Sequence, residues 1–301
     1  MSIFQYATIE DVREENVPIN KYNDERVLEF IELASRFINL QTEQYFVPIR
    51  ERHILDGNGT TSISSLDKIP IQEIKSITDT VLPAGQEIQP VDLVIPNSRS
   101  RRRREILLRP ETTAGLGANP VFSNSEHNIE LDGIFGWLEP RFREPITKTI
   151  AQPSSYSDKE ITLNNTNKIE DHFVPMVGKE TYPVISDVDN NTVKFDQKIQ
   201  FPVESGDKMV FYGLTPKPIR RVCIQIAIQS ANKLGSGGGQ LDFTETPEFQ
   251  SRVVSERTDN YSYRLAQDIP QGAIKQGDLT ADIYQVLREY TVDPHYRMGA
   301  V

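Results

Sequence analysis

Residues 24–45 read DERVLEFIELASRFINLQTEQY, and this stretch decides the fold more than any other. Asn23 or Asp24 is suited to cap the start of a helix here, and Pro48 is suited to end it. The apolar residues recur at helical spacing and therefore share one side of the helix; they are Val27, Phe30, Ile31, Ala34, Phe37, Ile38 and Tyr45. This side is wide enough to pack against a second helix or a sheet.

The residues before this helix predict a shorter one. Thr8 is a typical N-cap residue, and Asp11 follows three positions later, where a carboxylate meets free backbone N–H groups. Pro18 sets the latest end of this first helix.

The residues after the long helix change to strand spacing. Residues 50–55 and 60–66 flank the turn sequence Asp56-Gly57-Asn58-Gly59, which predicts a β-hairpin. Further short apolar runs follow, so up to Trp137 we expect two helices and a small antiparallel sheet.

Residues 147–213 show no helical pattern and instead predict a series of short strands joined by Asn-, Asp- and Ser-rich turns. Helical spacing returns after Pro216 and stops at Gly235. A last helix is expected to carry Ile283, Val286, Leu287 and Tyr290.

We therefore predict an α+β fold with a helical bundle core, a small antiparallel β-sheet and an inserted small all-β domain. The core is expected to comprise residues 1–146 and 215–301, with a C-terminal arm from about residue 291. The inserted β-domain is expected to comprise residues 147–214, a length that can fold independently.

The composition and the motifs of the sequence do not favour an enzymatic function. The 301 residues include one cysteine, Cys223, so an intrachain disulfide and a cysteine zinc site are excluded. The four histidines are scattered, and the glycine run 235–239 lacks the Lys and Ser/Thr of a P-loop. We expect no catalytic residues, no metal, no cofactor, no membrane span and no secretory signal.

The distribution of charge includes one basic run within an acidic chain of net charge −10. Six arginines lie between Asn97 and Pro110: Arg99, Arg101, Arg102, Arg103, Arg104 and Arg109. One interpretation is a solvated loop or strand edge, where charge discourages aggregation. The other is contact of Arg99 and Arg101–Arg104 with an acidic partner subunit or with DNA phosphates.

Several segments, taken in order, resemble the head–tail connector (adaptor) proteins of tailed phages. The segments that carry the resemblance are Tyr6-Ala7-Thr8 with Glu10-Asp11, Ala34-Ser35 with Ile38, Thr42 with Phe46, Leu55-Asp56-Gly57 with Gly59, Pro70-Ile71 with Ile74, Gly133 with Gly136-Trp137, the helix after Pro218, and Tyr261-Ser262-Tyr263 with Leu287 and Tyr290. The resemblance covers about three quarters of the chain, and residues 147–214 depart from the family's compact pattern.

The resemblance implies a structural protein of the virion neck, assembled in the host cytoplasm. Such a protein forms a homo-oligomeric ring of about twelve copies between the portal protein and a tail or neck protein. DNA passes through the ring without sequence-specific binding, which an acidic surface favours because it repels phosphate. The portal-docking arm is expected to include Tyr290, Pro294, His295, Tyr296 and Arg297.

Two alternatives stay open at this point. The protein could be a binding module whose inserted β-domain recognises a partner protein or a host glycan. It could also bind DNA ends through the arginine run.

Overall fold

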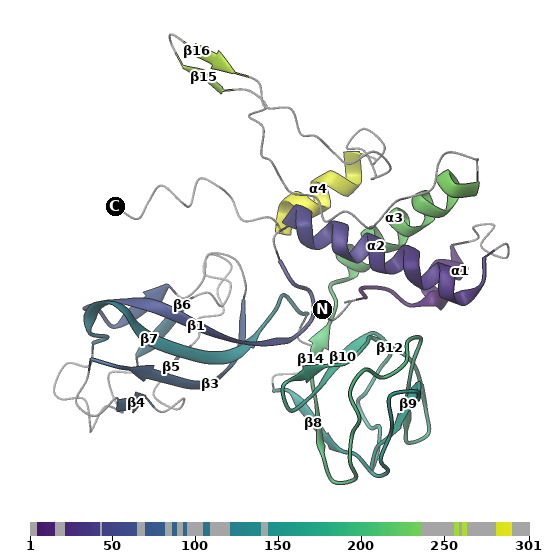
Figure 1. The fold of residues 1–301 in the computed structure, drawn as a ribbon, viewed down its shortest axis with the longest axis horizontal. Coiled ribbons are helices and arrows are strands. Elements are labelled where there is room, and N and C mark those ends of the chain that lie inside the picture. The colour runs from purple at the N-terminus through teal and green to yellow at the C-terminus, as the bar shows by residue number, and fades with distance from the viewer. Residues whose placement is uncertain are drawn as a thin grey trace.

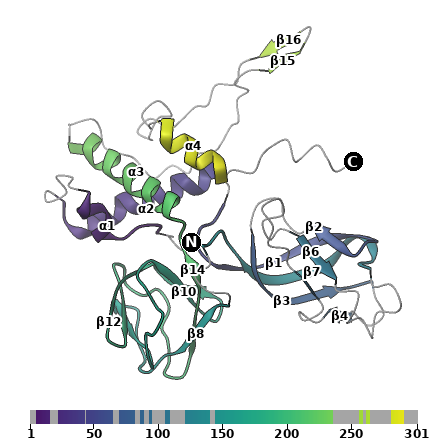
Figure 2. The same ribbon diagram turned by 180° about the vertical axis from the view of Figure 1, so that it is seen from behind.

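The computed structural model arranges the chain around three large hydrophobic clusters, one among the helices and two among the strands (Figures 1 and 2). In Figure 1 the helices lie above the two strand-built parts. The structure describes residues 5–15, 22–42, 44–64, 70–81, 86–88, 93–94, 105–108, 121–139, 144–235, 256–258, 261–263 and 281–290.

The helical part consists of four described helices: α1 (Ile9–Glu14), α2 (Asp24–Thr42), α3 (Lys217–Gly235) and α4 (Ala281–Tyr290). Helices α2 and α3 are in contact and cross each other, with α2 nearer the viewer in Figure 1 and α3 nearer in Figure 2. Each of the four predicted helices is therefore present in the part of the chain that the structure describes.

The local capping signals are also confirmed. The Thr8 hydroxyl accepts a hydrogen bond from the Asp11 N–H at 3.2 Å, and the Asp11 carboxylate accepts one from the Thr8 N–H at 2.8 Å. Asn23 caps α2, because its side-chain oxygen accepts from the Arg26 N–H at 3.0 Å. Helix α2 ends at Thr42, before the predicted end at Tyr45.

The sheet part comprises residues 49–135 and contains two sheets that share one core. The long sheet has the order β1-β7-β3-β4. Its strands are β1 (Ile49–Asn58), β7 (Asn124–Phe135), β3 (Ile71–Asp79) and β4 (Gln86–Ile88). The short sheet has the order β2-β6-β5, with β2 (Ser62–Ser64), β6 (Glu105–Leu108) and β5 (Leu93–Val94).

The predicted hairpin around Asp56-Gly57-Asn58-Gly59 is wrong in its pairing. Strand β1 continues through Gly57 and pairs with β7, whereas β2 pairs with β6 in the other sheet. Gly57 is required for close packing, since a Cβ atom there would lie 1.9 Å from the Ser123 carbonyl oxygen. Its N–H donates to the Asn128 side chain at 2.7 Å.

Residues 146–214 form a small closed barrel with its own core. One sheet has the order β11-β10-β14-β8 and the other the order β12-β13-β9. A bridge between Ile150 and Leu163 joins the sheets on one side, and the His172 N–H donates to the Ile185 oxygen at 2.9 Å on the other. The strands are β8 (Ile146–Thr149), β9 (Glu160–Thr162), β10 (Phe173–Val177), β11 (Glu180–Thr181), β12 (Ile185–Asp189), β13 (Thr192–Phe195) and β14 (Lys208–Leu214).

The predicted fold class, a helical bundle core with a small antiparallel sheet and an inserted β-domain, is wrong, because the described structure is not built around a helical bundle. Among the described residues, strand content is 39% against 26% helix, so strands outweigh helices in this part of the chain. The error arose because amphipathic helices give a clear signal in sequence, whereas short strands separated by irregular turns do not. The chain also forms an antiparallel pair, β15 (Glu256–Thr258) with β16 (Tyr261–Tyr263).

The absence of helix from residues 147–213 is confirmed, because every element of this region is a strand. Its proposed status as a separate inserted domain stays a prediction.

Candidate functional site

The predicted contact residues fall mostly outside the described part of the chain. Arg99 and Arg101–Arg104 lie outside it, and so do Pro294, His295, Tyr296 and Arg297. Tyr290 is described, and it is the last residue of α4. The described part of the chain therefore includes the point where the predicted arm begins.

Tyr290 lies where several segments of the chain meet. Its ring packs edge-on against Phe46 at a centroid distance of 5.5 Å and against Trp137 at 5.1 Å. Phe46 in turn packs edge-on against Tyr6, also at 5.5 Å. We call these four aromatic residues, Tyr6, Phe46, Trp137 and Tyr290, the joint.

The joint is where the sheet part connects to the rest of the molecule. The chain leaves α2 through Phe46 to enter β1, and it returns from β7 through Trp137. The Trp137 N–H donates to the Tyr45 oxygen at 2.7 Å, which ties these two connections together. Gly136 makes the approach possible, because it has a φ of 140° and a Cβ atom there would lie 2.1 Å from the Val47 oxygen.

A second meeting point joins the barrel to the helical part. The Nε2 atom of His172 lies 3.0 Å from each carboxylate oxygen of Asp11. The Asp196 carboxylate accepts a hydrogen bond from the Ile9 N–H at 2.7 Å, at the start of α1. Val174 and Val184 of the barrel are buried in the hydrophobic cluster of the helices. We call these polar and apolar contacts the barrel–helix contact.

The pKa values of the carboxylates at this contact are shifted in different directions. Burial disfavours the charged form of Asp11, but hydrogen bonds from His172 and the Thr8 N–H outweigh it, so the pKa of Asp11 lies below its usual value. Burial raises the pKa of Asp196, and the Ile9 N–H only partly offsets this effect. Burial also raises the pKa of the neighbouring Asp171.

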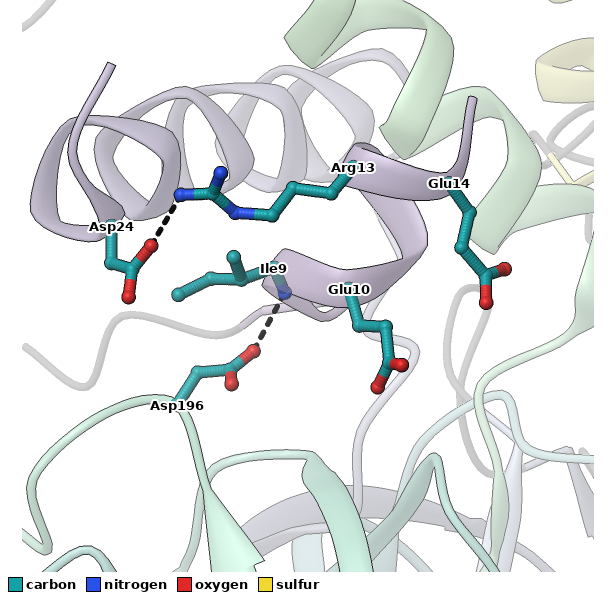
Figure 3. Close-up of a pocket in the computed structure, with 6 residues that line it drawn as sticks. All are labelled: Ile9, Glu10, Arg13, Glu14, Asp24 and Asp196. Carbon is teal, nitrogen blue, oxygen red and sulfur yellow. Dashed lines mark hydrogen bonds and ion pairs between the residues drawn. The ribbon is translucent and has the colours of Figure 1, made fainter. Parts of the chain in front are cut away.

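A shallow depression of about 470 Å³ lies beside the barrel–helix contact (Figure 3). Arg13 pairs with Asp24 across one side of it. The lining residues are Ile9, Glu10, Arg13, Glu14, Asp24 and Asp196. The depression is acidic and contains no nucleophile with a neighbouring base, so its chemistry does not point to catalysis.

The sheet part and the barrel also touch each other directly. The Tyr212 hydroxyl donates to a carboxylate oxygen of Glu73 at 2.6 Å. A small apolar cluster fills the space beside this bond and contains Ile134, Leu138, Met176 and Tyr212. Helices, sheet part and barrel are thus linked pairwise by specific contacts.

Catalytic and metal-binding chemistry finds no support among the described residues. Cys223 is completely buried, and burial raises the pKa of its thiol to about 12, which leaves it protonated. The described part of the chain contains no group of three His, Cys, Asp or Glu residues placed to hold a metal ion. None of the described helices is long and apolar enough to cross a membrane.

Sequence reasoning identified Asp11 as a helix-capping residue, but it did not identify His172 or Asp196 or link the barrel to α1. Asp11 and Asp196 are 185 positions apart in the numbering, and no local pattern links them. The sequence indicated the joint in part, because Trp137 is the sole tryptophan and follows Gly136 directly. No protein-family model matches the chain, and a search of curated proteins finds no similar sequence.

Proposed function

We propose that this protein is a structural component of a tailed-phage virion, a ring-forming adaptor between the portal and the tail or neck. Each ring would line part of the DNA passage. The formal charge of −10 supports a passage that repels DNA phosphates and does not hold them.

The observation that carries the proposal is the ordered set of residues that resembles head–tail connectors. Many of these residues have defined packing roles in this chain. Thr8 and Asp11 form the cap of α1, and the Ser35 hydroxyl accepts a hydrogen bond from the Tyr6 N–H at 3.2 Å. Gly136 is the glycine of the joint. A set of residues with such roles is what a shared scaffold would retain.

The contacts between parts of the molecule also suit an adaptor. A closed ring needs each copy to present two different surfaces at a fixed angle. Here the barrel–helix contact, the joint and the Tyr212–Glu73 bond each link parts that are distant in sequence. Such links hold the surfaces of one copy in a defined orientation.

The predicted arm begins at the joint, which gives portal docking a defined starting point. Tyr290 is held by Phe46 and Trp137, and the arm from residue 291 follows directly. We propose that this arm binds the portal, and that the joint anchors it.

Mass measurement of the purified protein, alone and mixed with a portal protein, tests the proposed function. We expect a ring, or a complex that forms when the portal is added. A matched variant that ends at Tyr290 should keep its fold but lose portal binding. A strict monomer that ignores the portal would overturn the proposal.

A further inference from the structure

The solvent side of helix α3 begins with basic residues. Lys217, Arg220 and Arg221 lie within its first five positions, and the whole helix contains no acidic residue. Lys217 and Arg221 are exposed and share one side, because they are four positions apart. Ile228 continues this side two turns later and is partly exposed. The ion pairs among the described residues include neither Lys217 nor Arg221. We call Lys217, Arg221 and Ile228 the basic surface.

The placement of these charges does not stabilise α3 itself. The first turn of a helix carries the positive end of the helix dipole, so basic side chains there are unfavourable. Lys217 and Arg221 also repel each other, since like charges four positions apart are neighbours on a helix. The stability of α3 therefore does not explain why these residues are basic, and such departures from local preference are expected at functional sites.

The solvent side of helix α2 begins with the opposite charge. Its first nine residues contain four carboxylates against one arginine. Glu25 and Glu29 are exposed and lie four positions apart on one side of the helix, and the partly exposed Leu33 continues that side. We call Glu25, Glu29 and Leu33 the acidic surface. It matches the basic surface in having two like charges followed by an apolar side chain.

The two surfaces lie at opposite ends of the α2–α3 pair and on its opposite sides. The start of α2 is beside the end of α3, because the Tyr22 hydroxyl donates to the Ala231 oxygen at 3.0 Å. The start of α3 is beside the exit from α2, where the Thr215 hydroxyl donates to the Phe46 oxygen at 3.2 Å. The buried sides of both helices share one hydrophobic cluster, so their exposed sides point away from each other (Figures 1 and 2). One copy therefore cannot bring its own two surfaces into contact.

From these observations we infer that, in the assembled ring, the acidic surface of each copy contacts the basic surface of the next copy. This inference rests on the proposed ring and names its lateral contact. Opposite charges orient the two copies, and Leu33 and Ile228 add apolar area beside the charges. Because the two surfaces differ and point in opposite directions, the contact is head-to-tail and can repeat around a ring.

A second copy is the occupant that suits both surfaces. DNA would match the basic surface, but the acidic surface would repel its phosphates. A symmetric contact between like surfaces would place acid on acid or base on base, which is unfavourable. A head-to-tail neighbour pairs opposite charges at both surfaces.

Charge reversal of one surface at a time tests the contact. The first variant carries Glu25→Lys and Glu29→Lys, and the second carries Lys217→Glu and Arg221→Glu. Native mass measurement should find at least several-fold less ring for each variant alone than for the natural protein, because like charges then meet at every contact. An equimolar mixture of the two variants should restore rings that contain both chains in equal numbers, because every contact between different chains again joins opposite charges.

A matched control has the same change of charge elsewhere. Glu126→Lys with Glu204→Lys alters two exposed residues, one in the sheet part and one in the barrel, and should assemble like the natural protein. Hydrogen exchange in α2 and α3 checks that each variant is folded. If a reversal variant does not fold, glutamine at the same positions replaces it, with a smaller loss of ring expected.

The outcomes separate this inference from the proposed function. Reversal variants that assemble like the natural protein, or a mixture that restores no ring, would overturn the contact although the ring stands. The contact is also overturned if the second variant keeps the ring but loses binding to a portal or to DNA, because the basic surface then serves that partner. If the natural protein forms no ring with or without a portal, the proposed function is overturned, and the contact falls with it.

Discussion

The helical part and the barrel differ in how the chain builds them. The barrel comes from one continuous stretch, residues 146–214, and its strands close around their own core. The helical part collects three distant segments around one core, together with Val174 and Val184 from the barrel. The main core of the barrel therefore comes from one stretch of chain, whereas the core of the helical part depends on contacts between distant segments and on the barrel beside it.

The largest expected effects separate these two cores. Phe30 in α2 and Phe211 in the barrel are both buried, at 2% and 1% exposure. We expect Phe30→Ala and Phe211→Ala each to lower the stability of its own core by about 3–5 kcal/mol, because each removes a large buried side chain.

Hydrogen exchange measured by mass spectrometry in mild denaturant reports the two cores separately. Phe30→Ala should reduce protection in the helices and leave β9, β13 and β14 protected. Phe211→Ala serves as the matched control for the barrel. Equal loss of protection everywhere in both variants would show that the two parts unfold as one unit and would contradict the comparison.

A smaller effect is expected where the two parts meet. Asp11 completes the capping box of α1 by accepting a hydrogen bond from the Thr8 N–H, and it also pairs with His172 of the barrel. We expect Asp11→Ala to lower the free energy of unfolding by about 1–3 kcal/mol, because it removes the side-chain half of the capping box and leaves the half-buried His172 without its carboxylate. Urea denaturation of Asp11→Ala and of the matched surface variant Glu10→Ala measures this. Equal effects of the two substitutions would rule out a special role for Asp11.

The pH dependence of this contact has two opposite contributions. The pKa of Asp11 is lowered in the folded protein, so its contribution to stability is present above the unfolded value of about 3.9 and is lost as pH falls through the folded pKa. The pKa of Asp196 is raised, so its favourable contribution is present below about pH 3.9 and is lost as pH rises through the folded pKa.

Asparagine variants separate these contributions. Asp196→Asn keeps an acceptor for the Ile9 N–H but cannot ionise, so its stability relative to the natural protein should improve between pH 4 and pH 7. For Asp11→Asn, the loss of unfolding free energy relative to the natural protein should be larger at pH 7 than at pH 3. Unfolding free energies at these pH values test both signs, and a constant difference for either variant would be the contrary result.

Local signals in the sequence predicted the helices because each depends on neighbours along the chain. The Thr8–Asp11 cap and the apolar side of α2 are examples, and both are present. Strand pairing could not be predicted in this way. Alternation along β1 indicates which side is buried, but not that Arg52 lies opposite Asp132 in β7. The turn-like Asp56-Gly57 therefore predicted the wrong partner.

The candidate site shows the same division between local and distant information. Tyr290 was identified from the helical spacing of the last helix and from the resemblance, and it lies at the joint. His172 and Asp196 were not identified, because their importance comes from contact with Asp11 and Ile9 across the fold. Such contacts depend on how the barrel is oriented, which no local pattern encodes.

The smallest expected effect lies on the surface of the helical part. Arg26 pairs with Glu29, and its guanidinium also lies 5.3 Å from the ring centre of Phe30. Exposed pairs at this spacing contribute about 0.2–0.5 kcal/mol and weaken with salt.

The two interactions of Arg26 can be separated by substitution. Glu29→Ala removes the ion pair alone, whereas Arg26→Ala also removes the contact with Phe30. We expect each substitution to lower the free energy of unfolding by less than about 1 kcal/mol. Arg26→Ala should cause the larger loss, and the extra loss, which comes from the Phe30 contact, should persist in 1 M salt. Urea denaturation at low and high salt measures the losses, and hydrogen exchange should place them in α2, away from the barrel. A change in barrel protection from either surface variant would mean that the barrel core is less independent of the helices than its closed strands indicate.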